Sequence, residues 1–269
     1  MKTIISLTSI PSRFKHVETT LRSLLNQDKK ADKIILYIPR YYKRFKKKVI
    51  HAPKVPKGVE VRFSDIDYGP STKILPAVKD YFNDDVRIVF CDDDRIYQPN
   101  MISSLIEASK ENPGHVIAFE GRDIKDLSKF NWQGKALPRA NVINKNFKYR
   151  LKRVLSLGAW KPRKNHSSGY SDTFAGFGGV LISPKFFTKT VFDIPTECWM
   201  NDDIWLSGNL ELNQKKIWIA NQDKNSSKAS KNQNKDALGA EKEDDKSRIN
   251  VNNTAVQYFR NVYGIWKDE

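Results

Sequence analysis

Short apolar runs alternate with stretches of helical periodicity through the first 120 residues. The apolar, β-branched runs predict five strands, at 3–8, 33–38, 59–66, 86–91 and 115–119. Between them, apolar residues recur every three or four positions and predict helices at 13–27, 73–82 and 100–110. Alternating strands and helices favour a parallel sheet covered on both faces. We therefore expect a single α/β domain with a mainly parallel, Rossmann-like sheet.

The pattern is less regular beyond residue 120. Glycines at 176, 178 and 179 lead into the apolar run 180–182, which we interpret as a loop entering a strand. A helix is expected at 201–212 and a strand at 216–220. Segment 221–250 holds seven basic and six acidic residues and few apolar ones, so it predicts a mobile loop or lid. A helix at 251–265 follows, and the chain divides into 1–120, 121–220, 221–250 and 251–269.

Composition narrows the class of protein. The 269 residues are 39% hydrophobic and 29% charged, which fits one globule with a substantial core. No window approaches the roughly 18 apolar residues of a membrane-spanning helix, and the N-terminus lacks a signal-peptide core, so we expect a cytoplasmic protein. Cys91 and Cys198 are too few for a disulfide framework and are expected to be buried, reduced thiols.

The net charge of +16 is concentrated in two windows. Residues 29–57 hold eleven basic residues and one acid, and 127–170 hold eleven basic residues and no acid. Within the second window, 147–155 reads as a basic amphipathic helix, which suits peripheral contact with an anionic membrane at its inner face. Two alternatives stay open: the windows are solvated faces, or the helix packs on the core with its cations outward.

Three adjacent carboxylates, Asp92, Asp93 and Asp94, follow the strand at 86–91. Neighbouring carboxylates raise one another's pKa unless a cation neutralises them, and their hard oxygen atoms suit Mg²⁺ or Mn²⁺. The triplet therefore predicts a metal site that would hold a diphosphate. The alternative is an acidic turn before the next helix.

A second acidic pair, Asp202 and Asp203, begins the helix expected at 201–212. Carboxylates in a first turn favour the helix dipole, so capping is one interpretation. The other is a general base, because a desolvated carboxylate near a metal site can take a proton from a hydroxyl group.

Two polar turns follow predicted strands. In 68–73, Gly69 and Pro70 make a turn, and Lys73 could place its charge on a phosphate. In 8–13, hydroxyl groups and Arg13 close the first strand. Both turns suit a nucleotide, and both could equally be a turn followed by a helix cap.

Together these motifs resemble the glycosyltransferases of the GT-A fold, and most of all the family 2-like bacterial enzymes that build surface polysaccharides. The resemblance covers roughly 3–220 and rests on five motifs: Ile5-Ser-Leu-Thr-Ser-Ile-Pro-Ser-Arg13, Gly69-Pro-Ser-Thr-Lys73, the Asp92-Asp93-Asp94 triplet in the position of the DxD motif, Gly176-Phe-Gly-Gly179, and Asn201-Asp-Asp-Ile-Trp-Leu206. The triplet and the downstream acidic pair are the more specific of these.

The resemblance implies a metal-dependent, inverting transfer of a sugar from a nucleoside-diphosphate sugar, expected to be UDP-linked, to a hydroxyl group of a surface glycan or lipid-linked sugar. Residues 1–120 would hold the donor, and 121–220 would hold the acceptor and the acidic pair. The residues that would bind the nucleotide sugar are Thr8, Ser9, Arg13, Asp67, Gly69, Lys73, Asp92, Asp93, Gly178 and Gly179. Asp94, with Asp92, would hold Mn²⁺ or Mg²⁺, and Asp203 or Asp202 would be the base, with a slight preference for Asp203.

The sequence departs from this pattern in one respect. Many GT-A enzymes supply a further metal ligand, often His, from the C-terminal part, whereas the last His here is His166, which we expect at the surface or acceptor site. Asp223, Asn252 or a water could serve, or the metal could rest on Asp94 and the diphosphate.

Two other functions compete with this one. A nucleotidyltransferase acting on sugar phosphates would also join such a sheet to acidic ligands, but the turn at 8–13 lacks the glycine-rich phosphate loop expected there. A nucleic-acid-binding module would use the basic windows and their aromatic residues, but it leaves the acidic triplet unexplained. We therefore do not expect nucleic acid as a partner.

Overall fold

The computed structural model describes most of the chain. The described residues are 1–49, 51–130, 132, 137–140, 147–157, 160, 167–221, 227–230 and 245–267.

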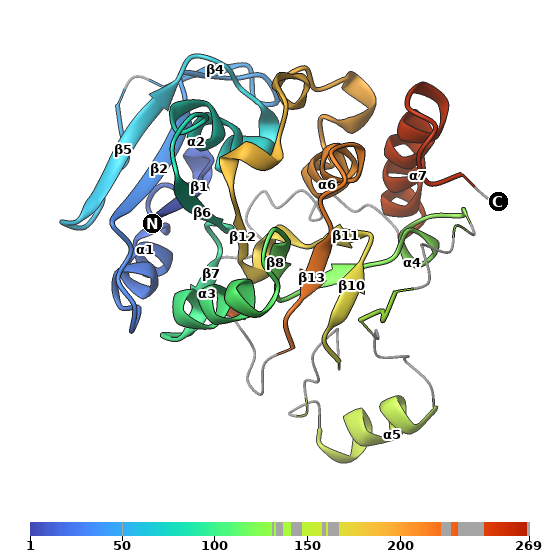
Figure 1. The fold of residues 1–269 in the computed structure, drawn as a ribbon. Helices are drawn as coiled ribbons and strands as arrows, with labels where there is room; N and C mark the ends of the chain where they lie inside the picture. Colours follow the sequence, from blue (N-terminus) through green and yellow to red (C-terminus); the bar gives the residue numbers. More distant parts are fainter. Residues whose placement is uncertain are drawn as a thin grey trace.

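An eight-stranded sheet forms the centre of the molecule (Figure 1), in the order β10-β13-β8-β12-β6-β1-β2-β5. The strands are β1 (Lys2–Thr8), β2 (Lys33–Pro39), β5 (Val59–Ser64), β6 (Val86–Phe90), β8 (Val116–Ala118), β10 (Gly169–Ser171), β12 (Val180–Ile182) and β13 (Ile217–Ile219). Strands β6, β1, β2 and β5 are parallel neighbours, and β8 and β13 also pair in parallel. Strand β12 is antiparallel to β6 and β8, and β10 to β13. The expected α/β fold with a mainly parallel sheet is confirmed.

Three short strand pairs lie outside this sheet. They are β3 (Tyr41–Tyr42) with β4 (Lys47–Lys48), β9 (Gly121–Arg122) with β11 (Thr173–Phe174), and β7 (Arg95–Tyr97) with β14 (Ser227–Ala229). The last pair matters for function, because β7 starts directly after the acidic triplet.

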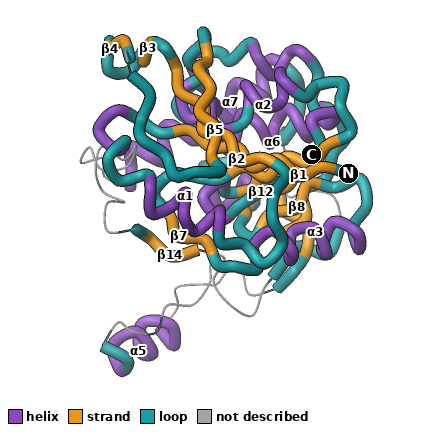
Figure 2. Tube along the Cα trace, turned by 90° about the vertical axis from the view of Figure 1, so that its left-hand side faces the viewer, coloured by secondary structure: helices purple, strands orange, loops and turns teal. Residues whose placement is uncertain are grey.

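Helices cover both faces of the sheet, as expected (Figures 1 and 2). Side chains alternate along the buried strands: Ile4, Ile88 and Phe90 belong to one apolar cluster, and Ile5 and Val89 belong to the other. The first cluster includes residues of α2 (Leu75–Asp80), α4 (Ile124–Leu127), α6 (Asp202–Leu212) and α7 (Asp245–Val262). The second includes residues of α1 (Glu18–Leu25) and α3 (Met101–Glu111). Strands from both halves of the chain share this one sheet.

Helix α5 (Phe147–Leu155) contributes to neither cluster. Short 3₁₀ turns form the remaining helical elements. These are η1 (Pro11–Arg13), η2 (Gly69–Lys73), η3 (Gly176–Gly178), η4 (Pro184–Phe186), η5 (Lys189–Phe192) and η6 (Thr196–Cys198). Cys91 and Cys198 are buried free thiols, as predicted. Among the residues described, no helix is both long and apolar enough to span a bilayer.

The predicted strands are confirmed to within two residues at each end, and three of the predicted helices differ by two residues or more at both ends. Helix α1 begins at Glu18 rather than at 13, because the chain first makes the tighter turn η1 at Pro11. Helix α2 is shortened in the same way by η2. Helix α7 begins at Asp245 rather than at 251.

The segment predicted as a mobile loop or lid, 221–250, contains regular structure in part of its described residues. Its mobility stays a prediction. Strand β14 pairs antiparallel with β7, and the last six residues of the segment are already the start of α7. A strand can form there with no buried apolar side chain because its partner supplies the backbone hydrogen bonds. The remaining residues of the predicted lid, 222–226 and 231–244, lie outside the described part of the chain.

Candidate active site

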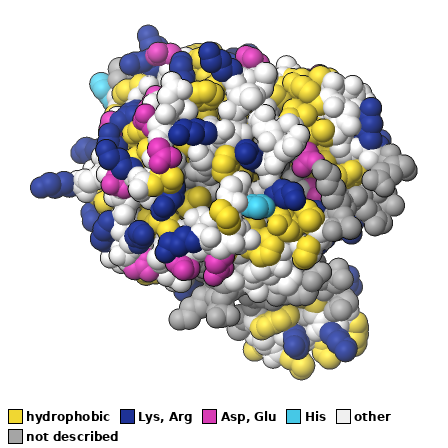
Figure 3. Space-filling view, viewed as in Figure 1, with side chains coloured by type: hydrophobic (Ala, Val, Ile, Leu, Met, Phe, Trp, Pro, Cys, Tyr) yellow, Lys and Arg dark blue, Asp and Glu magenta, His cyan; other side chains and the backbone are white. Residues whose placement is uncertain are grey.

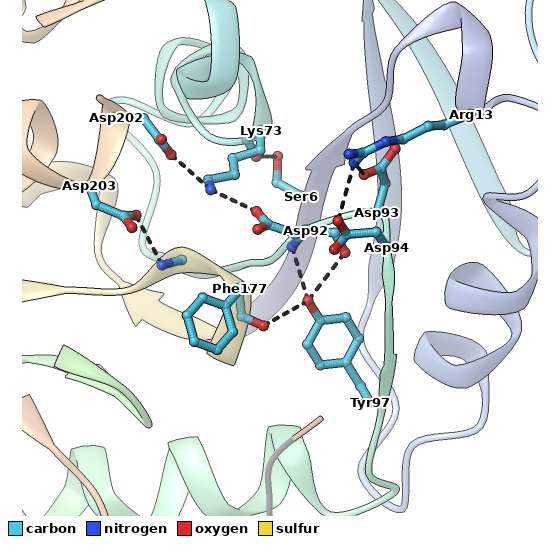
Figure 4. A network of polar contacts seen from close by, with 11 residues as sticks. Ser6, Arg13, Lys73, Asp92, Asp93, Asp94, Tyr97, Phe177, Asp202 and Asp203 are labelled. Carbon is cyan, nitrogen blue, oxygen red and sulfur yellow. Dashed lines mark hydrogen bonds and ion pairs between the residues drawn. The ribbon is translucent and has the colours of Figure 1, made fainter. Parts of the chain in front are cut away.

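The predicted motifs meet at one edge of the sheet (Figure 4). Strands β1 and β6 are parallel neighbours, so the turn after Thr8 and the triplet after β6 reach the same edge. Strand β12 runs the other way, and its entry turn η3 therefore arrives at that edge as well. Contacts through Lys73 and Gly176 join η2 and the N-terminus of α6 to this group.

Arg13 neutralises part of the triplet. Its Nη1 lies 2.7 Å from Asp93 Oδ1 and 3.3 Å from Asp94 Oδ2. Asp93 is buried, accepts a further hydrogen bond from the hydroxyl of Ser9, and its backbone carbonyl accepts one from Thr20 Oγ1. Burial acts to lower the pKa of Arg13, but the charges of Asp93 and Asp94 outweigh it and raise this pKa. Asp93 is thus fixed within the protein, whereas Asp94 is held only at the longer distance.

Lys73 forms the second internal cation of the site. Its Nζ lies 2.7 Å from Asp92 Oδ1 and 2.8 Å from Asp202 Oδ2, and its side chain is 7% exposed. Burial alone would lower the pKa of Lys73, yet the charges of Asp202 and Asp92 raise it well above its ordinary value. The hydroxyl of Ser6 donates to the Lys73 carbonyl at 2.6 Å and ties η2 to β1. Lys73 therefore remains charged and links the triplet to the downstream acidic pair.

The acidic pair does not cap helix α6. The N-cap is Asn201, whose side chain accepts from the N–H of Ile204 at 3.4 Å. Asp202 pairs instead with Lys73, and Asp203 Oδ1 accepts from the N–H of Gly176 at 3.0 Å. Both carboxylates are turned toward the triplet (Figure 4), which is the arrangement that the general-base interpretation requires.

Among the described residues, negative charge exceeds positive charge at this edge. The five carboxylates of the triplet and the acidic pair lie near three cations, Arg13, Lys73 and Arg95. Burial raises the pKa of Asp94 to about 6, and the charges of Asp92 and Asp93 add to the shift. Burial also raises the pKa of Asp203 to about 7, with the charge of Asp202 contributing next. Such shifts mark a site that favours an additional cation or a proton.

A metal ion fits this edge only in part. Across the described residues, no group of three or more His, Cys, Asp or Glu side chains is arranged to hold a metal ion. Mg²⁺ commonly binds through one or two carboxylates together with substrate phosphates and waters. Asp94, loosely held by Arg13, and the 32%-exposed Asp92 fit that second kind of site.

The predicted nucleotide-binding residues of the first two turns lie close by. Thr8 Oγ1 donates to the Tyr37 carbonyl at 2.8 Å, so its hydroxyl joins β1 to β2. Asp67 is buried and accepts from the N–H groups of Lys43 and Gly69 at 2.7 and 2.8 Å, which orders the turn before η2. Gly69 has φ +59°, and a Cβ there would lie 3.0 Å from Trp199. Their binding of a nucleotide stays a prediction.

Packing explains the two predicted glycines. A Cβ at Gly178 would lie 3.2 Å from Glu120 Cγ. Gly179 has φ +94°, and a Cβ there would lie 3.0 Å from Met101 Sδ on α3. Both glycines therefore let η3 pack closely on its neighbours, and their predicted approach to the donor or acceptor remains untested.

Three residues of the site carry no assignment from the sequence. A Cβ at Gly176 would lie 2.6 Å from Lys73 Nζ and 3.1 Å from Asp203 Oδ1. The Tyr97 hydroxyl contacts the Asp92 N–H at 3.0 Å and the Phe177 carbonyl at 3.1 Å, which joins β7 to η3. The Arg95 guanidinium lies 4.4 Å from the centre of the Phe177 ring. Only Gly176 had a signal, as part of the glycine motif.

The further metal ligand is not identified. His166 and Asp223 lie outside the described residues. Asn252 accepts from Asn201 Nδ2 at 2.7 Å and donates to the Leu127 carbonyl at 3.0 Å, so it joins α7 to α6 and α4.

One family model matches more than half of the chain. The family model described as Glycosyl transferase family 2 matches residues 12–178. Among solved structures, S. aureus TarS 1-349 aligns with 12% identity and a TM-score of 0.45, covering 98% of this chain and 73% of that one. The same S. aureus protein in complex with UDP-GlcNAc aligns with 13% identity and a TM-score of 0.46, covering 86% and 59%. No curated protein matches the sequence.

Proposed function

The chain belongs to glycosyl transferase family 2, and on that premise we propose that it moves a sugar from a nucleoside-diphosphate sugar, with UDP as the leaving group, to an acceptor hydroxyl. One observation carries the proposal most strongly. Asp92 and Asp202 both pair with the buried cation Lys73. The triplet and the acidic pair therefore belong to one site, although these two residues are 110 positions apart in the sequence. A donor and a base could meet there.

The donor would lie against the ends of β1 and β6. Arg13 and Lys73 place positive charge beside the position where a diphosphate would gain negative charge as its bond to the sugar breaks. Because both cations are already fixed by carboxylates, they need little rearrangement during the reaction. The turns at Thr8, Ser9, Asp67 and Gly69 would bind the nucleoside.

We assign a Mn²⁺ or Mg²⁺ ion to Asp94, with Asp92 as a second ligand. The bound ion would offset the charge of the diphosphate. The excess negative charge at this edge and the raised pKa of Asp94 support this assignment. The diphosphate and water would complete the coordination.

Asp203 is assigned as the general base. Asp202 is occupied by Lys73, whereas Asp203 accepts one backbone hydrogen bond and has a pKa near the pH of the cell. A base with such a pKa can accept the proton of the attacking hydroxyl without being permanently protonated. Attack from the face opposite the diphosphate would invert the configuration at the sugar carbon.

The acceptor would be a surface glycan or a lipid-linked sugar. The basic residues of 29–57 and 127–170 favour an anionic acceptor or an anionic membrane surface, because they leave the rest of the chain with a net charge of −5. Strand β14 lies next to the triplet, because the N–H of Ser230, the residue after the strand, donates to the Asp94 carbonyl at 3.0 Å. Strand β14 would then lie beside the donor, on the Asp94 side of the site.

Donor turnover tests this function. The purified protein would be incubated with a set of nucleotide sugars, with and without Mn²⁺, and the released nucleoside diphosphate would be measured. We expect release with at least one donor, dependent on the metal and abolished by Asp203→Asn. Release of pyrophosphate would instead indicate a nucleotidyltransferase. No release, together with no nucleotide-dependent thermal shift, would refute the proposal.

A further inference from the structure

Helix α5 exposes an apolar stripe. The exposed fractions of Phe147, Leu151, Val154 and Leu155 are 78%, 46%, 70% and 74%, and no residue of the helix is buried. At about 100° per residue, these four side chains fall within a stripe roughly 100° wide. With Leu157, the stretch 147–157 holds five of the fourteen exposed large apolar side chains in the described part of the chain. Such a concentration indicates a surface that binds something.

The helix is held by its opposite face. The ring of Tyr149 lies 5.5 Å from that of Trp160, and Lys152 Nζ lies 5.5 Å from the centre of the Trp160 ring. Arg153 Nη1 donates to the Trp160 carbonyl at 2.8 Å. These contacts use the side of the helix away from the stripe. The helix itself lies apart from the sheet in both Figures 1 and 2. The stripe therefore lies on the side of the helix opposite to its contacts with Trp160.

Cationic side chains flank the stripe. Lys148 and Arg150 are exposed and lie on either side of it by the helical repeat, and 127–170 contains no acidic residue. Basic and apolar side chains appear together on this part of the surface in Figure 3. An apolar stripe flanked by Lys and Arg is the pattern of helices that lie in the plane of an anionic membrane surface.

The charge pattern favours an anionic membrane over two other partners, a second copy of the helix and a nucleic acid. A second copy of the helix would bring like charges together, because the surrounding window carries eleven cations and no anion. A polyanion such as nucleic acid would satisfy Lys148 and Arg150, but would leave the apolar stripe in water. An anionic bilayer can bind both features, because its headgroups pair with the cations and its acyl-chain boundary buries the apolar stripe.

We propose that α5 docks the protein on an anionic lipid bilayer, with Phe147, Leu151, Val154 and Leu155 inserted at the headgroup boundary and Lys148 and Arg150 on lipid phosphates. One consequence of docking rests on the proposed function: a docked enzyme would act on an acceptor held at the membrane. Docking itself requires neither donor nor turnover, so the two proposals can fail separately.

Sedimentation of the full chain with lipid vesicles, in the absence of nucleotide sugar, tests docking. We expect binding to vesicles of phosphatidylglycerol and phosphatidylcholine, weak binding to pure phosphatidylcholine, and loss of binding as salt rises. Each cation removed should lower the partition coefficient about fivefold. The double substitution Lys148→Glu/Arg150→Glu should therefore lower it by at least roughly 25-fold. Phe147→Glu/Leu155→Glu should abolish binding. All four side chains are exposed, so the core should be unaffected.

Matched substitutions on the main body serve as controls. Lys79→Glu/Lys189→Glu changes the charge by the same amount, and Val262→Glu changes an apolar side chain that is 57% exposed. Both should bind vesicles nearly as the wild type does. Wild-type binding by the α5 variants, or no binding of the wild type to anionic vesicles, would overturn the proposal. Binding of a soluble polyanion through α5 without vesicle binding would also overturn it, and would assign α5 to a polyanionic partner. Nucleoside diphosphate release, measured separately, reports on the proposed function alone.

Discussion

Lys73 and Asp202 form a buried ion pair, with 2.8 Å between Lys73 Nζ and Asp202 Oδ2. The pair connects turn η2 to the first residue of helix α6. Lys73 also contacts Asp92, so a single ammonium group sets the distance between the triplet and the acidic pair. The placement of the site thus depends on one side chain that the protein shields from water.

Lys73→Gln is expected to destabilise the protein. The substitution leaves Asp92 and Asp202 without their cation, and breaking a buried pair from one side costs about 3–5 kcal/mol. Urea unfolding at neutral pH measures the change in the free energy of unfolding. Lys79→Gln, at an exposed position of α2, should change it by less than about 0.5 kcal/mol. Equal stability of the two variants would mean that the pair does not hold the site together.

The reaction rate should depend on the ionisation of Asp203. Because burial raises the pKa of Asp203 to about 7, the base is protonated below that pH and kcat/KM should rise as pH increases through about 7. Asp203→Asn should lower kcat by roughly 10²–10⁴-fold and remove this dependence. Asp85→Asn is the control, since this exposed carboxylate contacts only Lys185, at 3.8 Å, among the described residues. A rate that is flat across this pH range in the wild type would assign the proton transfer elsewhere.

Metal-dependent nucleotide binding should require Asp94. Protons compete with a metal for a carboxylate, and burial raises the pKa of Asp94 to about 6. Binding of Mn²⁺ with UDP should therefore weaken as pH falls through about 6, and Asp94→Asn should weaken it at every pH. Isothermal titration calorimetry at several pH values gives both results. Binding that is insensitive to Mn²⁺ in the wild type, or unchanged in Asp94→Asn, would rule out this metal site.

Gly176→Ala should impair activity more than stability. The added Cβ would lie 2.6 Å from Lys73 Nζ, so Lys73 must shift, and 3.1 Å from Asp203 Oδ1, so Asp203 must adjust slightly. A displacement of about 1 Å can cost roughly 10²-fold in rate. Steady-state kinetics and thermal unfolding of the same preparation separate the two effects. Wild-type kcat with a lowered melting temperature would show that Gly176 matters only for packing.

Sequence patterns predicted seven of the eight strands of the central sheet, because most of these strands are buried and their composition reflects burial. Strand β10 was not predicted. The runs at 33–38 and 86–91 correspond to β2 and β6 with small changes at the ends. Strand β14 had no such signal, since Ser227, Lys228 and Ala229 bury little and the strand exists through its backbone pairing with β7. The start of α7 was missed for a similar reason, because 245–250 is rich in polar residues.

The sequence indicated which residues belong to the candidate site, but not which of them form ion pairs and hydrogen bonds with one another. Strand order explains why Ser9 and Asp93 meet, and the sequence indicated that both follow strands. Arg13 pairs with Asp93 and Asp94, whereas Lys73 pairs with Asp92 and Asp202. This division depends on three-dimensional distances that the spacing of residues in the sequence does not encode. Tyr97 was missed because an aromatic residue in a short strand normally indicates packing rather than a hydrogen bond to a turn.

The central claim is that the acidic edge, with Arg13 and Lys73, is the donor site. A crystal structure of the protein with Mn²⁺ and UDP tests it most directly. We predict that the diphosphate lies at the ends of β1 and β6, within reach of Arg13 or Lys73, with Mn²⁺ bound between Asp94 and the phosphates. A diphosphate bound elsewhere, with Asp94 free of metal and the Lys73 pairs unchanged, would contradict the claim.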